Sequence, residues 1–233
     1  IQIIQSGMGK RIHELELLNR MLKYHHGLLN ILQQALEKKY HRAMTENCAE
    51  NVVNIMTNEF PTSAAKKTYA SCVFLEKEGK DYRVSENFEK MLENREFYKI
   101  LEEVVEFGIA RYQMNYSRTY QDTDLVLYQK YTYEDACRLL NWERNEVPLN
   151  IGGYKYDKKT KTFPVFINYD KAEDAIAYED RFVTRENLIA LSKHPRKVTS
   201  SDADHFFKRT ESDKENKILL FVRKNKDDKI SKE

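Results

Sequence analysis

Glycine and proline are scarce in this chain, with seven and four residues among 233. Folds made only of strands use both residue types often in their turns, so this scarcity disfavours an all-β fold and a linker-rich chain. The three cysteines, Cys48, Cys72 and Cys137, lie far apart and form no CxxC pair. We therefore expect reduced, buried thiols in a cytoplasmic protein, with neither disulfides nor a zinc site.

Long apolar runs and catalytic motifs are also missing. No run approaches the roughly twenty apolar residues of a membrane span, so we expect no membrane association. The sequence contains no phosphate-cradling GxxxxGK[ST] loop, no DExH helicase box and no HxK nuclease motif. No catalytic residue, metal ligand or cofactor site can be assigned from the spacing of its histidines and acids.

Aromatic residues and balanced charge are abundant instead. Fifteen tyrosines and eleven phenylalanines accompany a net charge of only +2. Tyrosine combines a flat apolar ring with a hydrogen-bonding tip, which suits wet interfaces. The near-neutral balance excludes a histone-like polycation but leaves room for a local basic face.

The first half of the chain has the pattern of a helical bundle with a short hairpin. Apolar residues recur at helical spacing, and Gly27 is expected to end the first helix as a left-handed C-terminal cap. Ser71–Leu75 and Tyr82–Val84 are typical of two short strands around a turn. Ser85 and Asn94 are suited to cap the two helices that follow. Together these elements predict a winged-helix-like arrangement, with helices at Lys10–Tyr24, Leu28–Tyr40, Val52–Phe60, the segment after Ser85, and Asn94–Met114.

The second half has a mixed pattern. Residues 115–124 lack apolar periodicity, so we place the domain boundary there and divide the chain into residues 1–120 and 121–233. Leu125–Tyr128 can be a strand or a lead-in, and Thr132 begins a short helix with capping-box spacing. This predicts an α+β unit with a curled sheet, with strands at Gly153–Tyr156, Phe163–Tyr169 and Lys217–Arg223 and helices at Thr184–Ser192 and Ser201–Lys208.

A family resemblance extends over nearly the whole chain. It is carried by Arg11–Leu15 and the Asn94–Tyr112 helix in the first half, and in the second half by Tyr133, Leu139–Trp142, Asn150, Gly152–Lys155, Pro164–Phe166, Tyr169, Lys171, Tyr178–Asp180 and Leu220–Val222. These residues resemble a bacterial domain family, itself labelled a domain of unknown function. It ends long proteins that carry a phospholipase-D-like nuclease and a superfamily II helicase.

The resemblance implies a function for the chain. Relatives of this kind resemble SauUSI-like type IV restriction enzymes, which serve in phage defence. In them an SRA-like C-terminal domain recognises methylated cytosine. The chain would then be a DNA-recognition and coupling region, cut at its C-terminus. Its partners would be double-stranded DNA, the helicase and nuclease parts of the same polypeptide and a second copy as a homodimer. No cofactor is expected in this part, whereas ATP and Mg belong to the parent motor.

A reader of one modified base would flip the nucleotide into a pocket with aromatic walls and polar groups for the base edge. Tyrosines supply walls, and carboxylates can accept hydrogen bonds from the exocyclic amine of cytosine. The predicted base pocket is Gly153, Tyr154, Tyr169, Asp170, Tyr178, Glu179 and Asp180. The alternative for each tyrosine is a half-buried strand residue, and for the glycines a tight turn.

Basic residues nearby could position the duplex through its phosphates. The predicted backbone contacts are Lys155, Lys158, Lys159, Lys193, Arg196 and Lys197. A solvated basic loop is the alternative for these side chains. Trp142, the single tryptophan, is expected to be a core or interdomain anchor. For the whole chain the alternative is a protein-interaction brace that docks on a helicase core and reads no base, and a hidden enzyme in the second half is a third hypothesis.

Overall fold

The computed structural model describes residues 8–54, 56–58, 67, 73–143, 146–147, 153–168, 180–192 and 194–223. They form two compact units. Unit 1 comprises the described residues within Ile1–Val126 and Glu143–Val147, and unit 2 those within Leu127–Trp142 and Pro148–Glu233. Helices and small sheets occur together, so the predicted α+β class is confirmed.

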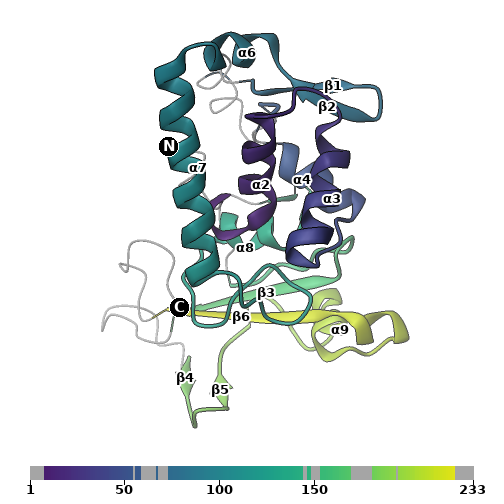
Figure 1. The fold of residues 1–233 in the computed structure, drawn as a ribbon. Helices are drawn as coiled ribbons and strands as arrows, with labels where there is room; N and C mark the ends of the chain where they lie inside the picture. The colour runs from purple at the N-terminus through teal and green to yellow at the C-terminus, as the bar shows by residue number, and fades with distance from the viewer. Residues whose placement is uncertain are drawn as a thin grey trace. The chain divides into compact units, whose positions relative to one another are not determined.

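Unit 1 consists of helices and one hairpin (Figure 1). The predicted hairpin is present, with Leu75 paired to Val84 at one end and Glu78 to Asp81 at the other, but its first strand, predicted at Ser71–Leu75, is Leu75–Glu78. In chain order, the elements are η1 (Met8–Lys10), α2 (Ile12–Met21), α3 (Leu28–Tyr40), α4 (Glu46–Val53), β1 (Leu75–Glu78), β2 (Asp81–Val84), α6 (Glu86–Leu92) and α7 (Arg95–Asn115).

Helix α2 is the centre of unit 1, because it packs against α3, α4 and α7. Its residues Ile12–Leu18 are all buried, charged ones included. The apolar spacing predicted a helix at Lys10–Tyr24, and the structure has it at Ile12–Met21 with its charged side chains buried together with the apolar ones. Neighbouring helices surround α2, and the buried acids find cationic or hydroxyl partners there: Glu16 contacts Arg20, Lys39 and Tyr40.

Two predicted helix caps are confirmed at the starts of α6 and α7. Ser85 accepts a hydrogen bond from the backbone N–H of Phe88, and Asn94 accepts two at the start of α7, as predicted. Gly27 is different. It has the predicted left-handed conformation (φ 63°), but α2 already ends at Met21, so Gly27 begins α3 instead of ending the first helix.

The predicted third helix begins earlier than its apolar residues suggested. It runs from Glu46 to Val53, because Thr45 accepts a hydrogen bond from the backbone N–H of Cys48 and so caps the first turn. Residues 59–66, where the prediction placed the end of this helix, lie outside the described part of the chain.

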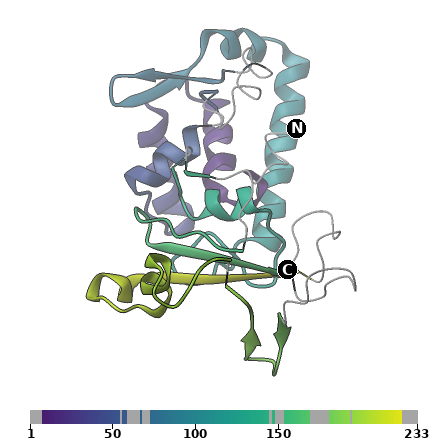
Figure 2. The same ribbon diagram turned by 180° about the vertical axis from the view of Figure 1, so that it is seen from behind.

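Unit 2 is built around two parallel strands that lie side by side in both views, with α9 beside them (Figures 1 and 2). Residues 153–157 pair with β3 through two isolated antiparallel bridges, Tyr154 to Val165 and Asp157 to Thr162, where a continuous strand was predicted. The elements are α8 (Tyr133–Leu139), β3 (Thr162–Asn168), β4 (Arg181–Phe182), β5 (Leu188–Ile189), α9 (Ser201–Phe207), η3 (Glu211–Glu215) and β6 (Lys217–Arg223).

Several unit 2 predictions are confirmed. Thr132 and Asp135 form the capping box of α8, and β6 and α9 lie where they were expected. Trp142 is fully buried and donates a hydrogen bond from its indole Nε1 to the Thr162 hydroxyl at 2.7 Å. It is therefore a core anchor of unit 2.

The predicted helix at Thr184–Ser192 is wrong. The segment is a hairpin, in which β4 pairs antiparallel with β5. The Thr184 hydroxyl accepts hydrogen bonds from the backbone N–H groups of Glu186 and Asn187, which stabilises the turn. Such local side-chain bonds offer the backbone an alternative to a helix.

Leu125–Tyr128 forms no strand and is the lead-in of the two alternatives. The segment just before it packs on unit 1, since Asp124 is held by Arg42, and unit 1 extends to Val126. Within the described residues, no helix combines the length and apolar character that a membrane crossing requires.

Candidate functional site

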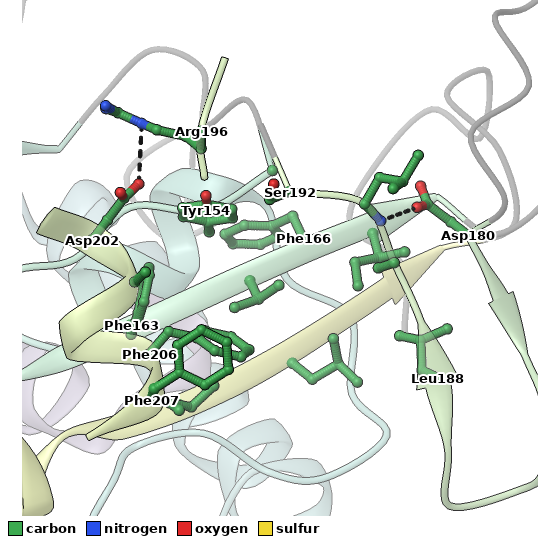
Figure 3. A pocket seen from close by; sticks show the side chains of 18 of the residues that line it. Tyr154, Phe163, Phe166, Asp180, Leu188, Ser192, Arg196, Asp202, Phe206 and Phe207 are labelled. Carbon is green, nitrogen blue, oxygen red and sulfur yellow. Dashed lines mark hydrogen bonds and ion pairs between the residues drawn. The ribbon is translucent and has the colours of Figure 1, made fainter. Parts of the chain in front are cut away.

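Unit 2 contains a cavity of about 750 Å³. We call it the aromatic cavity, after the rings of Tyr154, Phe163, Phe206 and Phe207 that border it (Figure 3). Its size lies within the range of small-molecule and cofactor pockets, about 300–1,000 Å³. It is therefore large enough for a nucleotide-sized ligand.

The floor of the aromatic cavity is the face of the parallel strand pair. Phe163 is in register with Ile218, and Val165 with Leu220, and all four residues border the cavity. Alternate residues of a strand point to the same face, so the pairing places these side chains together. Phe166 and Phe221, one position further on, stack at 4.7 Å between ring centroids.

The walls are aromatic rings from segments on either side of the strand pair. Tyr154 meets Phe163 edge to face at 5.3 Å between ring centroids, and Phe206 of α9 meets Phe163 at 5.8 Å. Phe163 is fully buried, whereas Phe207 is 55% exposed. The rings nearest the floor are thus fixed by packing, while Phe207 remains open to a ligand.

One end of the aromatic cavity is polar. Asp202 of α9 pairs with Arg196, with 3.2 Å between Oδ2 and Nε, and Figure 3 shows this pair near Tyr154. The other carboxylate oxygen, Asp202 Oδ1, is buried and has no hydrogen-bond partner among the described residues. A buried acceptor without a partner is costly, by about 1–3 kcal/mol, so a ligand that donates a hydrogen bond here would recover that energy.

Asp180 lies at the other end of the cavity in the same view (Figure 3). Its Oδ1 accepts a hydrogen bond from the backbone N–H of Leu191 at 2.9 Å. This bond ties together the two arms of the β4–β5 hairpin. Asp180 therefore has a structural task, and Asp202 is the better placed acceptor for a ligand.

The predicted base pocket falls partly on this cavity. Gly153, Tyr154 and Asp180 border it. Gly153 has a φ of 88° and accepts a hydrogen bond from the backbone N–H of Phe166, so it also helps to pair residues 153–157 with β3. Four further predicted residues lie outside the described part of the chain: Tyr169, Asp170, Tyr178 and Glu179.

The predicted backbone contacts divide into two groups. Arg196 and Lys197 border the aromatic cavity, whereas Lys193 lies outside the described residues. Lys155, Lys158 and Lys159 do not border it. The ammonium of Lys155 lies 5.5 Å from the centroid of the Trp142 ring, and Lys158 and Lys159 are exposed in the turn before β3.

Sequence patterns alone hardly indicated the remaining cavity residues. Asp202 and Phe206 lie on a short helix with no unusual pattern, and Ile218 and Leu220 belong to a uniformly apolar run. Five apolar residues in succession, Ile218–Val222, predict a strand but do not show which face of it will stay open.

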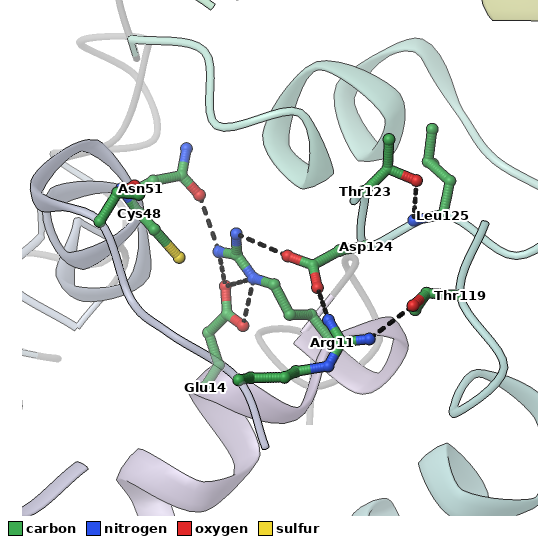
Figure 4. Close-up of polar contacts among 10 residues, drawn as sticks. Arg11, Glu14, Cys48, Asn51, Thr119, Thr123, Asp124 and Leu125 are labelled. Atoms are coloured by element: carbon green, nitrogen blue, oxygen red, sulfur yellow. Dashed lines mark hydrogen bonds and ion pairs between the residues drawn. The ribbon is translucent and has the colours of Figure 1, made fainter. Parts of the chain in front are cut away.

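A second cluster of charged residues lies buried in unit 1 (Figure 4). The Arg11 guanidinium donates from Nε to Glu14 at 2.9 Å and from a terminal nitrogen to Asn51 at 2.8 Å. Arg42 pairs with Asp124 and donates to the Thr119 hydroxyl at 2.6 Å. Arg11 and Glu14 are fully buried, so this ion pair serves as a structural brace of unit 1.

The two described thiols are held in their protonated form. Burial raises the pKa of the Cys48 thiol to about 11 and that of Cys137 to about 12. Both cysteines are buried, as predicted. Cys72 lies outside the described residues. No group of three or more His, Cys, Asp or Glu within the described ranges is placed to hold a metal ion.

Two family models match the chain. Residues 125–233 match a domain of unknown function, DUF3427, and residues 4–116 match another, DUF8090. The DUF3427 match thus contains the aromatic cavity, and the DUF8090 match contains α2 and α7. No curated protein and no solved structure matches the chain.

Proposed function

We propose that unit 2 reads DNA by receiving a base, swung out of the duplex, in the aromatic cavity. The chain would be the recognition and coupling region of an ATP-dependent restriction enzyme that acts on DNA containing 5-methylcytosine. Helicase and nuclease parts of the same polypeptide would supply ATP hydrolysis, with Mg, and cleavage. The family resemblance of the sequence suggests this class, and the aromatic cavity supports base binding.

The observation that carries the proposal is the combination of aromatic rings and a buried acceptor in one cavity. A flipped base loses its stacking in the duplex, at a cost of a few kcal/mol, and needs flat walls to replace it. Stacking on an aromatic side chain contributes about 1–3 kcal/mol per base. Tyr154 and Phe207 offer such surfaces at the cavity. Asp202 Oδ1 offers an acceptor for an exocyclic amine such as N4 of cytosine.

The charges around the cavity support the same assignment. Arg196 and Lys197 border it and could contact the phosphates that flank a flipped nucleotide. Arg196 is also paired with Asp202, so it holds the carboxylate in place. A methyl group adds little surface, so discrimination by the cavity would be about 1–3 kcal/mol, as for one methylene in a fitted pocket.

The test is a binding measurement with a matched pair of variants. Asp202 and Asp204 both lie on α9, and each is paired with an arginine, but only Asp202 borders the cavity. Asp202→Ala should weaken binding to a duplex with 5-methylcytosine by about ten- to a hundredfold, as expected for one hydrogen bond to a charged group. Asp204→Ala should leave that affinity and the preference for methylated DNA unchanged. Equal affinity of the unaltered chain for methylated and unmodified duplexes in several sequence contexts would refute the proposal.

A second function is favoured by the exposure of the cavity rim. Phe207, Leu191 and Leu220 are each more than half exposed, and contiguous apolar surface of this kind also marks protein-docking sites. The chain would then be a brace on a helicase core. In that case Phe207→Ala should weaken association with the helicase part, and neither Asp202→Ala nor DNA methylation should change any affinity.

A further inference from the structure

Helix α7 carries a stripe of exposed apolar residues that unit 1 leaves uncovered. Ile100 is 55% exposed, Phe107 69% and Met114 83%. The three residues are seven positions apart, so they lie almost one above another along about 21 Å of helix. We call them the α7 stripe.

The opposite side of the same helix anchors it to unit 1. Val105, Gly108 and Tyr112 are buried there, and α7 packs beside α2 (Figure 1). The approach to α2 is close, because a Cβ added at Gly108 would come within 2.6 Å of the Leu15 side chain. Helix α7 is thus firmly seated, and the stripe is not needed to hold it in place.

The stripe is symmetric about Phe107. Ile100 lies seven positions before Phe107 and Met114 seven positions after it. If two copies of α7 pack antiparallel with the two Phe107 rings at the twofold axis, each Ile100 meets the Met114 of the other copy. A twofold interface requires this self-complementarity, in which residue i contacts j and j contacts i.

The charges beside the stripe follow the same symmetry. Glu103 lies four positions before Phe107 and Arg111 four positions after it, so an antiparallel pair places each Glu103 level with the Arg111 of the other copy. Both side chains are exposed. In a parallel pair Glu103 would face Glu103 and Arg111 would face Arg111. The charges therefore select the antiparallel arrangement.

We propose that this chain forms a homodimer through the α7 stripe, with α7 of one copy antiparallel to α7 of the other and the dyad at Phe107. The partner is a second copy, because the helix is complementary to itself when a copy runs in the opposite direction. Apolar positions then meet apolar ones, and acidic positions meet basic ones. The dimer would join two DNA-reading units, but the inference does not depend on what unit 2 binds. A helix pair of this length is a small interface, so the dissociation constant should be on the order of micromolar.

The first test is a charge-reversal cycle on the full chain, read by sedimentation equilibrium. Glu103→Arg places two arginines opposite each other, and Arg111→Glu places two glutamates, so each single change should raise the dimer dissociation constant about tenfold or more. The double variant restores opposite charges and should recover the original value. Glu37→Arg, an exposed reversal on α3, is the matched control and should change nothing.

The second test distinguishes the antiparallel geometry from other dimers by disulfide trapping. Phe107→Cys places two thiols at the dyad, so it should cross-link alone. Ile100→Cys and Met114→Cys place their own pairs about 21 Å apart and should cross-link only when the two variants are mixed. The unaltered chain, with Cys48 and Cys137 buried, gives the background. A chain that stays monomeric at ~100 µM, well above the expected constant, would overturn the proposal. So would a double reversal that fails to restore a dimer broken by the single changes, or Ile100→Cys cross-linking alone.

Discussion

His13 should make the stability of unit 1 sensitive to mildly acidic pH. The residue lies in the first turn of α2 and is only 3% exposed. Its Nδ1 is buried and finds no hydrogen-bond partner within the described residues. Burial lowers the pKa of His13 to about 4, and the positive charge of Arg11 acts in the same direction. The folded protein therefore holds His13 neutral at pH values where the unfolded chain already binds a proton.

The direction and the size of the change in unfolding free energy follow from the linkage between proton binding and folding. The folded pKa is below the unfolded value, so the free energy of unfolding falls as the pH drops from about 6.5 towards 4. From the two pKa values the loss is about 1.4 kcal/mol at pH 5.5 and about 2 kcal/mol at pH 5, approaching about 3 kcal/mol at still lower pH. These losses are a large part of the stability of an ordinary domain.

Urea unfolding of the chain and of a His13→Leu variant, at pH 7 and at pH 5, measures this effect. Far-UV circular dichroism reports mainly the helices of unit 1, while the fluorescence of Trp142, the single tryptophan, reports unit 2. Leucine removes the titrating group and leaves no buried nitrogen without a partner. Between pH 7 and pH 5, the unaltered chain should lose about 2 kcal/mol more than the variant by circular dichroism.

Other acidic effects are common to both proteins and cancel in the comparison. Equal losses in the two proteins would refute the reasoning. An NMR titration of the His13 imidazole gives the folded pKa directly, and a value near 6.5 would refute it even if the variant did not fold.

Three further changes have expected outcomes. Gly108→Ala should destabilise unit 1 in spite of the roughly 1 kcal/mol gain in helix propensity, because its Cβ would lie 2.6 Å from Leu15; an unchanged or raised unfolding midpoint would contradict this. Ser85→Ala should cost about 1 kcal/mol in urea unfolding through loss of the α6 cap. The hydrogen bond from His205 lowers the pKa of Asp213 to about 2, so its stabilisation is present above pH 4 and lost as the pH falls towards 2. Asp213→Asn should abolish that part of the pH dependence of unit 2, followed by Trp142 fluorescence.

Local signals in the sequence predicted the local parts of the fold. Ser85, Asn94 and Thr132 cap helices with their own side chains, so the starts of α6, α7 and α8 could be placed from a few neighbouring residues. In the segment 184–192, one local pattern favours a helix and another favours a turn. Leu188 and Leu191 have helical spacing, but the Thr184 hydroxyl closes a turn, and the pairing of Phe182 with Leu188 makes the segment a hairpin.

The aromatic cavity could not be predicted because it depends on contacts between distant residues. Its floor exists only once β3 pairs in parallel with β6, more than fifty residues later, in the register that sets Val165 beside Leu220. The difference between the carboxylates of Asp180 and Asp202 also depends on contacts with residues elsewhere in the chain. Asp180 is engaged by the backbone of Leu191, and Asp202 keeps one oxygen that has no hydrogen-bond partner among the described residues. Sequence alone shows two acids and cannot rank them.

The buried charges of unit 1 illustrate the same limit. Nothing in the sequence around Arg11 and Glu14 indicated that both charges are fully buried. Asn51 and Asp124 contact Arg11 from positions 40 or more residues away along the chain. Because a buried charge needs partners, the contacts among these residues offset the desolvation cost of burying Arg11 and Glu14.

The most direct test of base binding in the aromatic cavity is a fluorescence measurement on the DNA itself. A duplex carries 2-aminopurine next to one 5-methylcytosine, and a second duplex carries unmodified cytosine at that position. When the methylated base leaves the stack, 2-aminopurine loses a stacking neighbour and its fluorescence rises. We predict a rise at saturating protein for the methylated duplex, little change for the unmodified one, and loss of the rise in Asp202→Ala but not in Asp204→Ala. A methylated duplex that binds the protein without any rise in fluorescence would contradict base entry into the cavity.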